Sequence, residues 1–340
     1  MEKIVDLKQF VKKSGDRYYR NSQFKQALEK YLDAVKLGMS NSGIYFMIAS
    51  LVKDENEEEA IKYLDKALEL DNSSPCISNC NFRKGELLMN LKRYEDALKV
   101  FLIAEKEGMH YEWLYYGIMY CLLKKENEFS DMLALKYAKK IAAIDIPLGY
   151  YYQGYIYWSR EKYDIALKLF LKAEQYGGSH CNLFTRMADI YERLGDYEKS
   201  LIYTNKALSL DSQHAMAHFE KGIVYNRQEN FTKAINKFLL VEKLDPTIMY
   251  LYEWIADSYF WQGGLENFKM AFKYTCKAIK RTPNRKHLYW HKKICIICII
   301  CIFFSLTFRS IDFFINYIKK LLDLKQNTCK IFRFNKYCVN

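Results

Sequence analysis

Residues 195–211 read GDYEKSLIYTNKALSLD, and residues 229–246 repeat the arrangement as ENFTKAINKFLLVEKLDP. Residues 92–108 (KRYEDALKVFLIAEKEG) and 161–177 (EKYDIALKLFLKAEQYG) read alike. Each stretch has an aromatic residue, a small residue three positions later, and a second small or β-branched residue seven positions after that. A motif that returns at intervals of this length indicates stacked helical repeats, so repetition sets the fold class.

The first small residue occurs eight times, at intervals of 32 to 37 residues. It stands at Ala27, Ala60, Ala97, Ala134, Ala166, Ser200, Ala234 and Ala271. The second follows seven residues later each time, at Ala34, Ala67, Ala104, Ile141, Ala173, Ala207, Val241 and Ala278. Seven residues make two helical turns, so both positions face the same neighbour and let two helix backbones approach closely.

A helix is also expected ahead of each of these helices. Gly15, Gly85 and Gly222 stand twelve residues before the first small residue, and each is followed three positions later by a large side chain. Prolines are expected between repeats, where a helix has to stop, and the chain has Pro75, Pro147, Pro246 and Pro283. The pattern predicts eight antiparallel helix pairs.

This signature resembles that of the tetratricopeptide repeat family over roughly residues 8–283. The resemblance implies an all-α fold: a right-handed superhelical solenoid of about eight helix-turn-helix repeats whose first helices line a concave groove. The expected repeats span approximately 8–40, 41–77, 78–109, 110–146, 147–180, 181–214, 215–248 and 249–283. A C-terminal tail at 284–340, with an apolar helix at about 294–318, follows them. The implied function is a non-enzymatic scaffold or adaptor that binds a peptide or helix of a protein partner in the groove.

First-helix residues that are offset from the packing stripe are expected to point into this groove. The predicted partner-binding residues are Tyr111, Tyr115, Tyr151, Tyr152, Tyr155, Trp158, Arg186 and Trp254. Aromatic side chains are favoured as anchors because they bury a large area at small entropic cost. The alternative is that neighbouring repeats pack on these rings as core.

The resemblance also allows one binding mode of the family to be tested. Chaperone cofactors of this family hold a terminal carboxylate with a Lys and an Asn four residues apart on a first helix. The nearest match is Lys12, but Asp16 stands where the Asn should be. An acidic side chain would repel the carboxylate of the ligand, so binding of that kind is not expected.

Charge and motifs argue against several other classes of protein. The net charge is +12, yet residues 285–340 carry 11 Lys/Arg and 2 Asp/Glu, whereas the rest of the chain carries 41 and 38. The near balance of the body removes the case for a nucleic-acid partner.

No P-loop, HExxH, GxSxG or dinucleotide-binding motif occurs, so neither an enzyme nor a cofactor is expected. His287, His291 and Cys295 share a helical spacing, but one helix does not close a tetrahedral metal site, so no metal is expected.

Cysteine usage and the start of the chain indicate the compartment. The ten cysteines form no framework of spacings in the body, and the first residues, MEKIVDLKQF, carry charges where a secretory signal needs an apolar core. We expect a reduced, cytoplasmic protein.

The tail has three interpretations. Residues 294–308 (ICIICIICIFFSLTF) carry no charge, and the apolar run resumes after Arg309 and Asp312 as far as Ile318. This segment could tether the protein to a membrane, either spanning it or lying in the interface with lysines on anionic headgroups. It could instead cap the last repeat or occupy the groove of its own chain, which would make the protein an autoinhibited regulatory module. The third interpretation is that it is not a selected functional segment.

Overall fold

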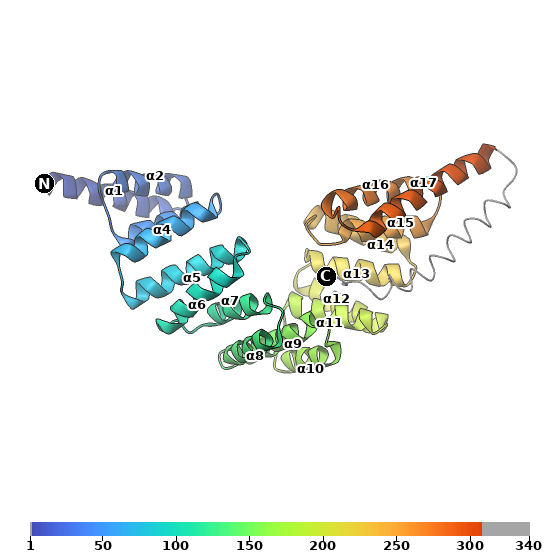
Figure 1. The fold of residues 1–340 in the computed structure, drawn as a ribbon, viewed down its shortest axis with the longest axis horizontal. Helices are drawn as coiled ribbons and strands as arrows, with labels where there is room; N and C mark the ends of the chain where they lie inside the picture. The colour runs from blue at the N-terminus through green and yellow to red at the C-terminus, as the bar shows by residue number, and fades with distance from the viewer. Residues whose placement is uncertain (1, 308–340) are drawn as a thin grey trace. The chain divides into compact units, whose positions relative to one another are not determined.

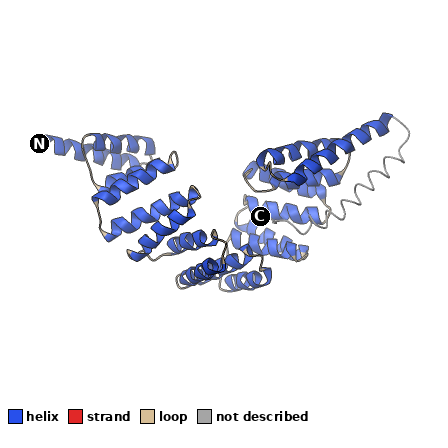
Figure 2. Ribbon diagram, in the orientation of Figure 1, coloured by secondary structure: helices blue, strands red, loops and turns tan. Residues whose placement is uncertain are grey.

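The computed structural model of the chain describes residues 2–307. Within that range it contains 17 α-helices and no strand (Figure 2). The chain divides into two compact units, Met1–Gly178 and Ser179–Asn340. The predicted all-α class is confirmed over the described residues.

The first unit consists of five helix pairs, coloured from blue to green in Figure 1. The pairs are α1 (Glu2–Arg20) with α2 (Phe24–Lys36), α3 (Ser42–Val52) with α4 (Glu57–Leu70), α5 (Ser74–Asn90) with α6 (Tyr94–Lys106), α7 (Glu112–Leu123) with α8 (Glu128–Ala142), and α9 (Ile146–Ser159) with α10 (Tyr163–Gln175). Each helix packs on its neighbours in sequence, and the first helices α5 and α7 also contact each other.

The second unit continues the same arrangement with three pairs and a further helix. These are α11 (Cys181–Arg193) with α12 (Tyr197–Leu210), α13 (Ala215–Arg227) with α14 (Phe231–Leu244), α15 (Leu251–Gln262) with α16 (Leu265–Arg281), and finally α17 (Lys286–Thr307). Here too the first helices contact one another, α11 with α13 and α13 with α15, and α17 packs on α16.

The small residues lie where the helices meet. All eight residues of the first series, from Ala27 to Ala271, are fully buried, and the second series is buried as well. The ring of Phe101 on α6 shows why the first helices that pack against it carry glycine. A Cβ atom on Gly85 of α5 would lie 2.4 Å from this ring, and one on Gly117 of α7 would lie 2.8 Å from it. Phe101 therefore occupies a slot between two consecutive first helices that only residues without a side chain can form.

Two of the four prolines do not lie between helices, so the prediction was wrong for them. Pro75 and Pro147 occupy the first turns of α5 and α9. The first turn tolerates proline because the N–H groups there have no partner within the helix, and the fixed φ of proline suits a helix start. As a result α5 begins at Ser74, ahead of the start that was predicted for the third repeat. Pro246 and Pro283 do lie between helices.

A polar contact that spans one repeat occurs in both units. In the first unit Glu105 of α6 accepts hydrogen bonds from Tyr137, at 2.8 Å, and from Lys140, both on α8. In the second unit Glu242 of α14 accepts them from Tyr274, at 2.9 Å, and from Lys277, at 2.6 Å, both on α16. The Nζ atom of each lysine also lies within 4.7 Å of the centroid of the tyrosine ring beside it. These contacts join consecutive pairs through their second helices.

The first part of α17 covers the last pair. Leu288, Ile294 and Cys295 are buried, and the last two join Phe260 of α15 and Ala271 of α16 in one apolar cluster. The Nδ1 atom of His291 lies 2.8 Å from Oγ1 of Thr275 on α16. These contacts support the capping interpretation for the start of the tail, since the end of a helical repeat array has to be covered. Residues 308–318 of the predicted apolar helix lie outside the described residues.

Candidate functional site

The helices α7 and α9 present aromatic residues on two consecutive first helices. Their inner sides bury Leu114 and Ile118 of α7 and Ile156 of α9, which fixes the rotation of both helices. The start of α9 is held by Asp145, whose side chain accepts a hydrogen bond from the N–H of Leu148 at 2.8 Å. This is the usual role of an N-cap residue. Core packing and this cap thus set the positions of the helices that carry the aromatic residues.

Six aromatic side chains form a surface that we call the aromatic face. Its members are Trp113, Tyr116 and Tyr120 on α7 and Tyr152, Tyr155 and Trp158 on α9. The rings of Tyr116 and Tyr152, with centroids 5.2 Å apart, join the two helices. On α7 the rings of Trp113 and Tyr116 meet edge to face at 6.4 Å, and on α9 those of Tyr155 and Trp158 stack at 5.7 Å.

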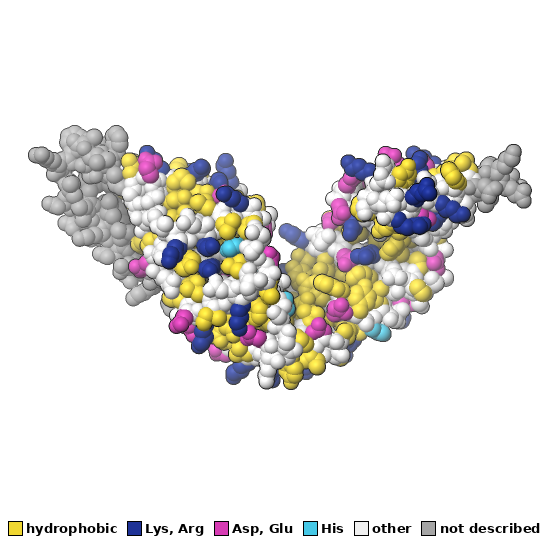
Figure 3. Space-filling model, turned by 180° about the vertical axis from the view of Figure 1, so that it is seen from behind, with side chains coloured by type: hydrophobic (Ala, Val, Ile, Leu, Met, Phe, Trp, Pro, Cys, Tyr) yellow, Lys and Arg dark blue, Asp and Glu magenta, His cyan; other side chains and the backbone are white. Residues whose placement is uncertain are grey.

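The exposure of these rings suits a binding surface. Trp113 is 60% exposed, whereas the five other side chains are half-buried; Tyr116, Tyr152 and Tyr155 also pack against the core of the first unit. Figure 3 shows hydrophobic side chains, with tyrosines counted among them, gathered in a broad patch over the middle of the first unit. Rings that already hold each other in place lose little freedom when a partner binds, which lowers the entropic cost of association.

Two hydroxyl groups of the aromatic face, those of Tyr116 and Tyr152, have a raised pKa. Burial raises the pKa of Tyr116 to about 12, with smaller contributions from Tyr155 and Tyr120. Burial likewise raises the pKa of Tyr152 well above its ordinary value. Both groups therefore stay protonated and can donate or accept a hydrogen bond. At the end of α7 the ammonium group of Lys124 lies 5.0 Å from the ring centroid of Tyr120, within cation–π range.

Three of the eight predicted partner-binding residues, Tyr152, Tyr155 and Trp158, belong to the aromatic face. Two others, Tyr115 and Tyr151, are buried and offer little surface. The hydroxyl of Tyr115 lies 3.1 Å from Nδ1 of His110, and the ring of Tyr151 lies 5.8 Å from that of Phe170 on α10. These two rings therefore contribute to the helix packing.

The remaining three predicted residues lie elsewhere. Tyr111 precedes α7, and burial raises its pKa; its ring lies 5.3 Å from that of Phe82 on α5. Arg186 on α11 and Trp254 on α15 are half-buried and belong to the second unit. The guanidinium carbon of Arg227 lies 5.3 Å from the ring centroid of Trp254. That all eight residues contact one partner stays a prediction.

Sequence reasoning missed Trp113, Tyr116 and Tyr120. The signal was present, because positions 113, 116 and 120 are spaced by three and four residues, which places three aromatic side chains on one side of a helix. The predicted projection instead selected Tyr115, one residue away from this stripe.

The first helices α11 and α13 of the second unit carry paired charges on the sides that face each other. Both carboxylate oxygens of Asp189, which is 1% exposed, accept hydrogen bonds from Nε of Arg193 at 3.1 Å. Glu192 accepts a hydrogen bond of 2.8 Å from Nε of Arg227, which extends across from α13. The pair of Glu192 and Arg227 therefore joins α11 to α13, whereas the pair of Asp189 and Arg193 lies within α11.

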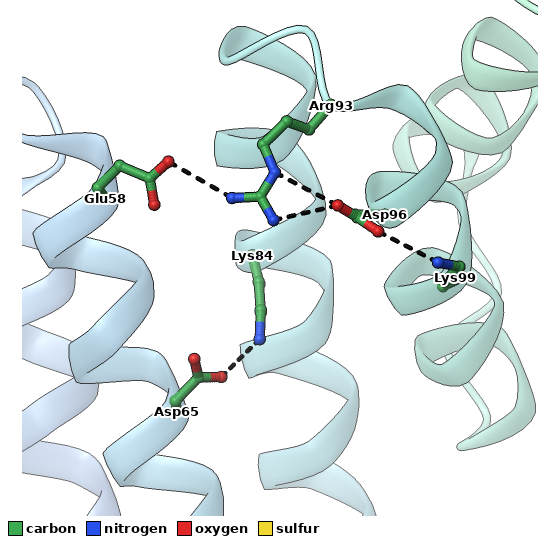
Figure 4. A network of polar contacts seen from close by, with 6 residues as sticks. All are labelled: Glu58, Asp65, Lys84, Arg93, Asp96 and Lys99. Atoms are coloured by element: carbon green, nitrogen blue, oxygen red, sulfur yellow. Dashed lines mark hydrogen bonds and ion pairs between the residues drawn. The ribbon is translucent and has the colours of Figure 1, made fainter.

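A shallow depression of about 450 Å³ lies between α4, α5 and α6. Its charged side chains also pair among themselves (Figure 4). Lys84 donates a hydrogen bond of 2.6 Å to Asp65, and Arg93 lies between Glu58, at 3.4 Å, and Asp96, at 3.0 Å. These ion pairs join consecutive helix pairs and do not converge on a vacant centre.

Three further expectations concern metal, carboxylate and membrane binding. Among the described residues, no three His, Cys, Asp or Glu side chains gather so as to hold a metal ion. Asp16 accepts hydrogen bonds of 2.8 Å from both Lys12 and Tyr31. Burial acts to raise the pKa of Asp16, but the hydrogen bonds from Lys12 and Tyr31 outweigh this effect, so the pKa lies below its ordinary value. The charged carboxylate therefore holds the ammonium group of Lys12. Over residues 2–307, no helix combines the length and the apolarity needed to cross a membrane.

Family models described as "Tetratricopeptide repeat" match residues 13–75 and 182–214. A TPR repeat-containing protein of Methanocaldococcus jannaschii is 26% identical over 226 residues, which are 62% of this chain and 39% of that protein. The Hsp70–Hsp90 organizing protein of Triticum aestivum is 23% identical over 256 residues, which are 69% of this chain and 40% of that protein. The chain therefore spans about two fifths of the length of these relatives.

Solved structures share the fold. A tetratricopeptide repeat protein from Parabacteroides merdae superposes with a TM-score of 0.63 at 14% identity, over 74% of this chain and 98% of that chain. A chain of the Cut9–Hcn1 hetero-tetramer of APC/C superposes with a TM-score of 0.61 at 12% identity, over 83% of this chain and 54% of that chain. Similarity at this level of identity concerns the arrangement of helices.

Proposed function

Because this chain belongs to the tetratricopeptide repeat family, we propose that it is a non-enzymatic scaffold that binds a peptide or helix of a protein partner on the aromatic face of α7 and α9. Repeats of this family generally mediate protein–protein interactions. The observation that carries the proposal is the contact between Tyr116 and Tyr152, which joins aromatic residues of two consecutive first helices into one surface.

The chemistry of the aromatic face suits a partner with apolar side chains and a polar backbone. Tryptophan and tyrosine are enriched among the residues that dominate binding energy at interfaces, because they combine a large apolar ring with a polar tip. Trp113 offers the most exposed ring of the face, and the half-buried rings of Tyr116 and Tyr152 add apolar area with polar tips.

One relative makes a different ligand worth excluding. The name of the Triticum aestivum protein links it to Hsp70 and Hsp90. In this chain Lys12 is held by Asp16, which also accepts from Tyr31. We therefore assign the partner to the aromatic face and not to a carboxylate site on α1.

The second part of the proposal concerns the tail. We propose that residues 294–318 tether the scaffold at a membrane surface, because α17 contains no acidic residue and has exposed isoleucines beside lysines. The autoinhibited alternative places this segment on the partner-binding surface of its own chain. Ile294 and Cys295, the first residues of the segment, are already buried against Phe260 and Ala271, which disfavours that alternative.

Selection of peptides from a random library by the immobilised full chain tests the first part. The selected peptides should bind Trp113→Ala and Tyr152→Ala at least about tenfold more weakly than the parent, as is typical for truncated aromatic anchors. Phe129→Ala is the matched control, since Phe129 is 65% exposed on the second helix α8. Equal binding by all three variants, with unchanged thermal melting, would place the partner elsewhere.

A further inference from the structure

The helix α17 has two different sides. One side, with Leu288, Ile294 and Cys295, is buried against α15 and α16. The opposite side carries a row of exposed residues spaced by three and four positions, which we call the outer stripe: Lys286, Tyr289, Lys293, Ile296 and Ile300. The spacing places these five side chains along one line over about 21 Å of helix.

The outer stripe combines charge and apolar surface. Tyr289, Ile296 and Ile300 are 44%, 38% and 45% exposed, and the two lysines are exposed beside them. Within the described part of the chain, neither Lys286 nor Lys293 takes part in an ion pair. An aliphatic surface of this kind would be buried by a ligand that is apolar and negatively charged at the same time.

The surroundings of the stripe are strongly basic. Residues 265–307, which make up α16, α17 and the turn between them, contain nine Lys/Arg and a single acidic residue, Glu266. Glu266 is paired with Lys269 at 2.7 Å, and Lys277 and Arg285 are paired with Glu242 of α14 and Glu253 of α15. The other six basic side chains of the stretch belong to no ion pair among the described residues. The local excess of positive charge attracts an anionic surface over about a Debye length, before any contact forms.

We infer that the outer stripe of α17 binds an anionic phospholipid surface, with Ile296 and Ile300 entering the boundary of the acyl chains and Lys286 and Lys293 on the headgroups. This inference rests on the proposed tether and gives it a surface, a lipid class and an orientation. The helix lies in the plane of the interface, because its other side is held by Phe260, Ala271 and Thr275 of the last helix pair.

Two other occupants fit the stripe less well. A second copy of the chain would use the three-and-four spacing as a coiled-coil seam, but that would bring lysines into its centre without an acidic partner. A nucleic acid would satisfy the lysines and leave Ile296 and Ile300 against a polar backbone, with no base-reading side chain beside them. Of the three occupants, the lipid surface is the one that accepts both kinds of residue.

Flotation of the full chain with vesicles tests the inference. Vesicles of phosphatidylcholine are compared with vesicles that also contain phosphatidylserine, using the parent, Lys286→Gln/Lys293→Gln, and Ile296→Asn/Ile300→Asn. Removal of two lysines from a membrane contact should weaken binding to the anionic vesicles about 30-fold. High salt screens the attraction between the lysines and the headgroups, so the apolar contact alone remains. Under that condition Ile296→Asn/Ile300→Asn should bind the anionic vesicles more weakly than the lysine variant does.

A matched control removes the same charge elsewhere. Lys136 and Lys139 are exposed on α8, and Lys136→Gln/Lys139→Gln should bind vesicles as the parent does. Thermal melting has to be unchanged in all variants. Because every substituted side chain is exposed, the fold is expected to persist.

The outcomes separate the inference from the proposed function. A full chain that floats with neither kind of vesicle overturns the tether and the stripe together. If the parent and every variant float equally well, the tether stands and the assignment of lipid binding to the outer stripe is wrong. Tighter binding to DNA or RNA than to anionic vesicles, abolished by the lysine substitutions, would reassign the stripe to nucleic acid. A dimer that is lost in Ile296→Asn/Ile300→Asn would reassign it to self-association.

Discussion

Replacement of Gly85 by alanine tests the helix register that underlies the whole repeat array. The new Cβ would lie 2.4 Å from the ring of Phe101, more than about 1 Å inside the 3.5–4.0 Å at which carbon atoms pack. The ring is 1% exposed and cannot retreat, because its other edge lies against Gly117 of α7. Overpacking in such a site costs up to about 3 kcal/mol, whereas alanine stabilises a helix interior by up to about 1 kcal/mol relative to glycine. Gly85→Ala should therefore lower the free energy of unfolding by about 2 kcal/mol.

Urea denaturation followed by circular dichroism measures this change, and two controls accompany it. Gly43→Ala lies on an exposed part of α3, where the nearest side-chain atom would be 3.5 Å away, so its stability should match or slightly exceed that of the parent. Phe101→Leu removes the clashing ring and should make the two losses non-additive when combined with Gly85→Ala. The reasoning is refuted if Gly85→Ala is as stable as the parent, or if the two substitutions add without interaction.

Three further predictions concern the core, the contact between repeats and alkaline pH. Ala97→Arg places a long charged side chain in a fully buried helix contact and should destabilise the protein by more than about 3 kcal/mol; unchanged melting would show that the register is wrong. Glu105→Gln weakens the contacts with Tyr137 and Lys140, so it should cost about 1 kcal/mol and lower the pKa of Tyr137, which NMR of labelled tyrosine would detect. Burial raises the pKa of Tyr137 and Tyr274 above the ordinary 10.0. The stability that these two groups contribute is therefore complete below pH 10 and is lost as the pH rises through the pKa of the folded state. A melting temperature that stays constant well above pH 10 would contradict this.

The helix pairs could be predicted because small residues recur at a helical spacing, with Ile141 and Val241 as the larger exceptions. Ala97 and Ala104 are both fully buried where two helices touch. The position of Pro75 could not be predicted in the same way, because proline is compatible both with a turn and with the first turn of a helix. Only the backbone of α5, which begins at Ser74, distinguishes the two.

The contacts between repeats were harder to predict than the repeats themselves. Glu105 meets Tyr137 and Lys140 across 32 and 35 residues, so the pairing depends on how far consecutive helix pairs are rotated. The recurrence of a tyrosine followed by a lysine three residues later, at 137 and 140 and again at 274 and 277, was nevertheless legible in the sequence. A comparison of equivalent positions in all repeats would have identified it.

The aromatic face could be predicted only in part. The sequence of α9 predicts a cluster of rings, and in the structure Tyr151 contacts both Tyr152 and Tyr155, while Tyr155 stacks on Trp158. Which rings of α7 join them depends on the rotation of that helix about its axis, and Gly117 against Phe101 fixes that rotation. As a result Tyr115 is buried, whereas Tyr116 is half-buried and meets Tyr152 of α9.

Photocrosslinking from the aromatic face tests the central claim most directly. A benzophenone amino acid at position 113, the most exposed ring position of the face, is compared with the same residue at position 129 on α8. Irradiation of the full chain together with a selected peptide should give a covalent product from position 113 and none from position 129. A product of equal yield from both positions, or from position 129 alone, would contradict the assignment of partner binding to α7 and α9.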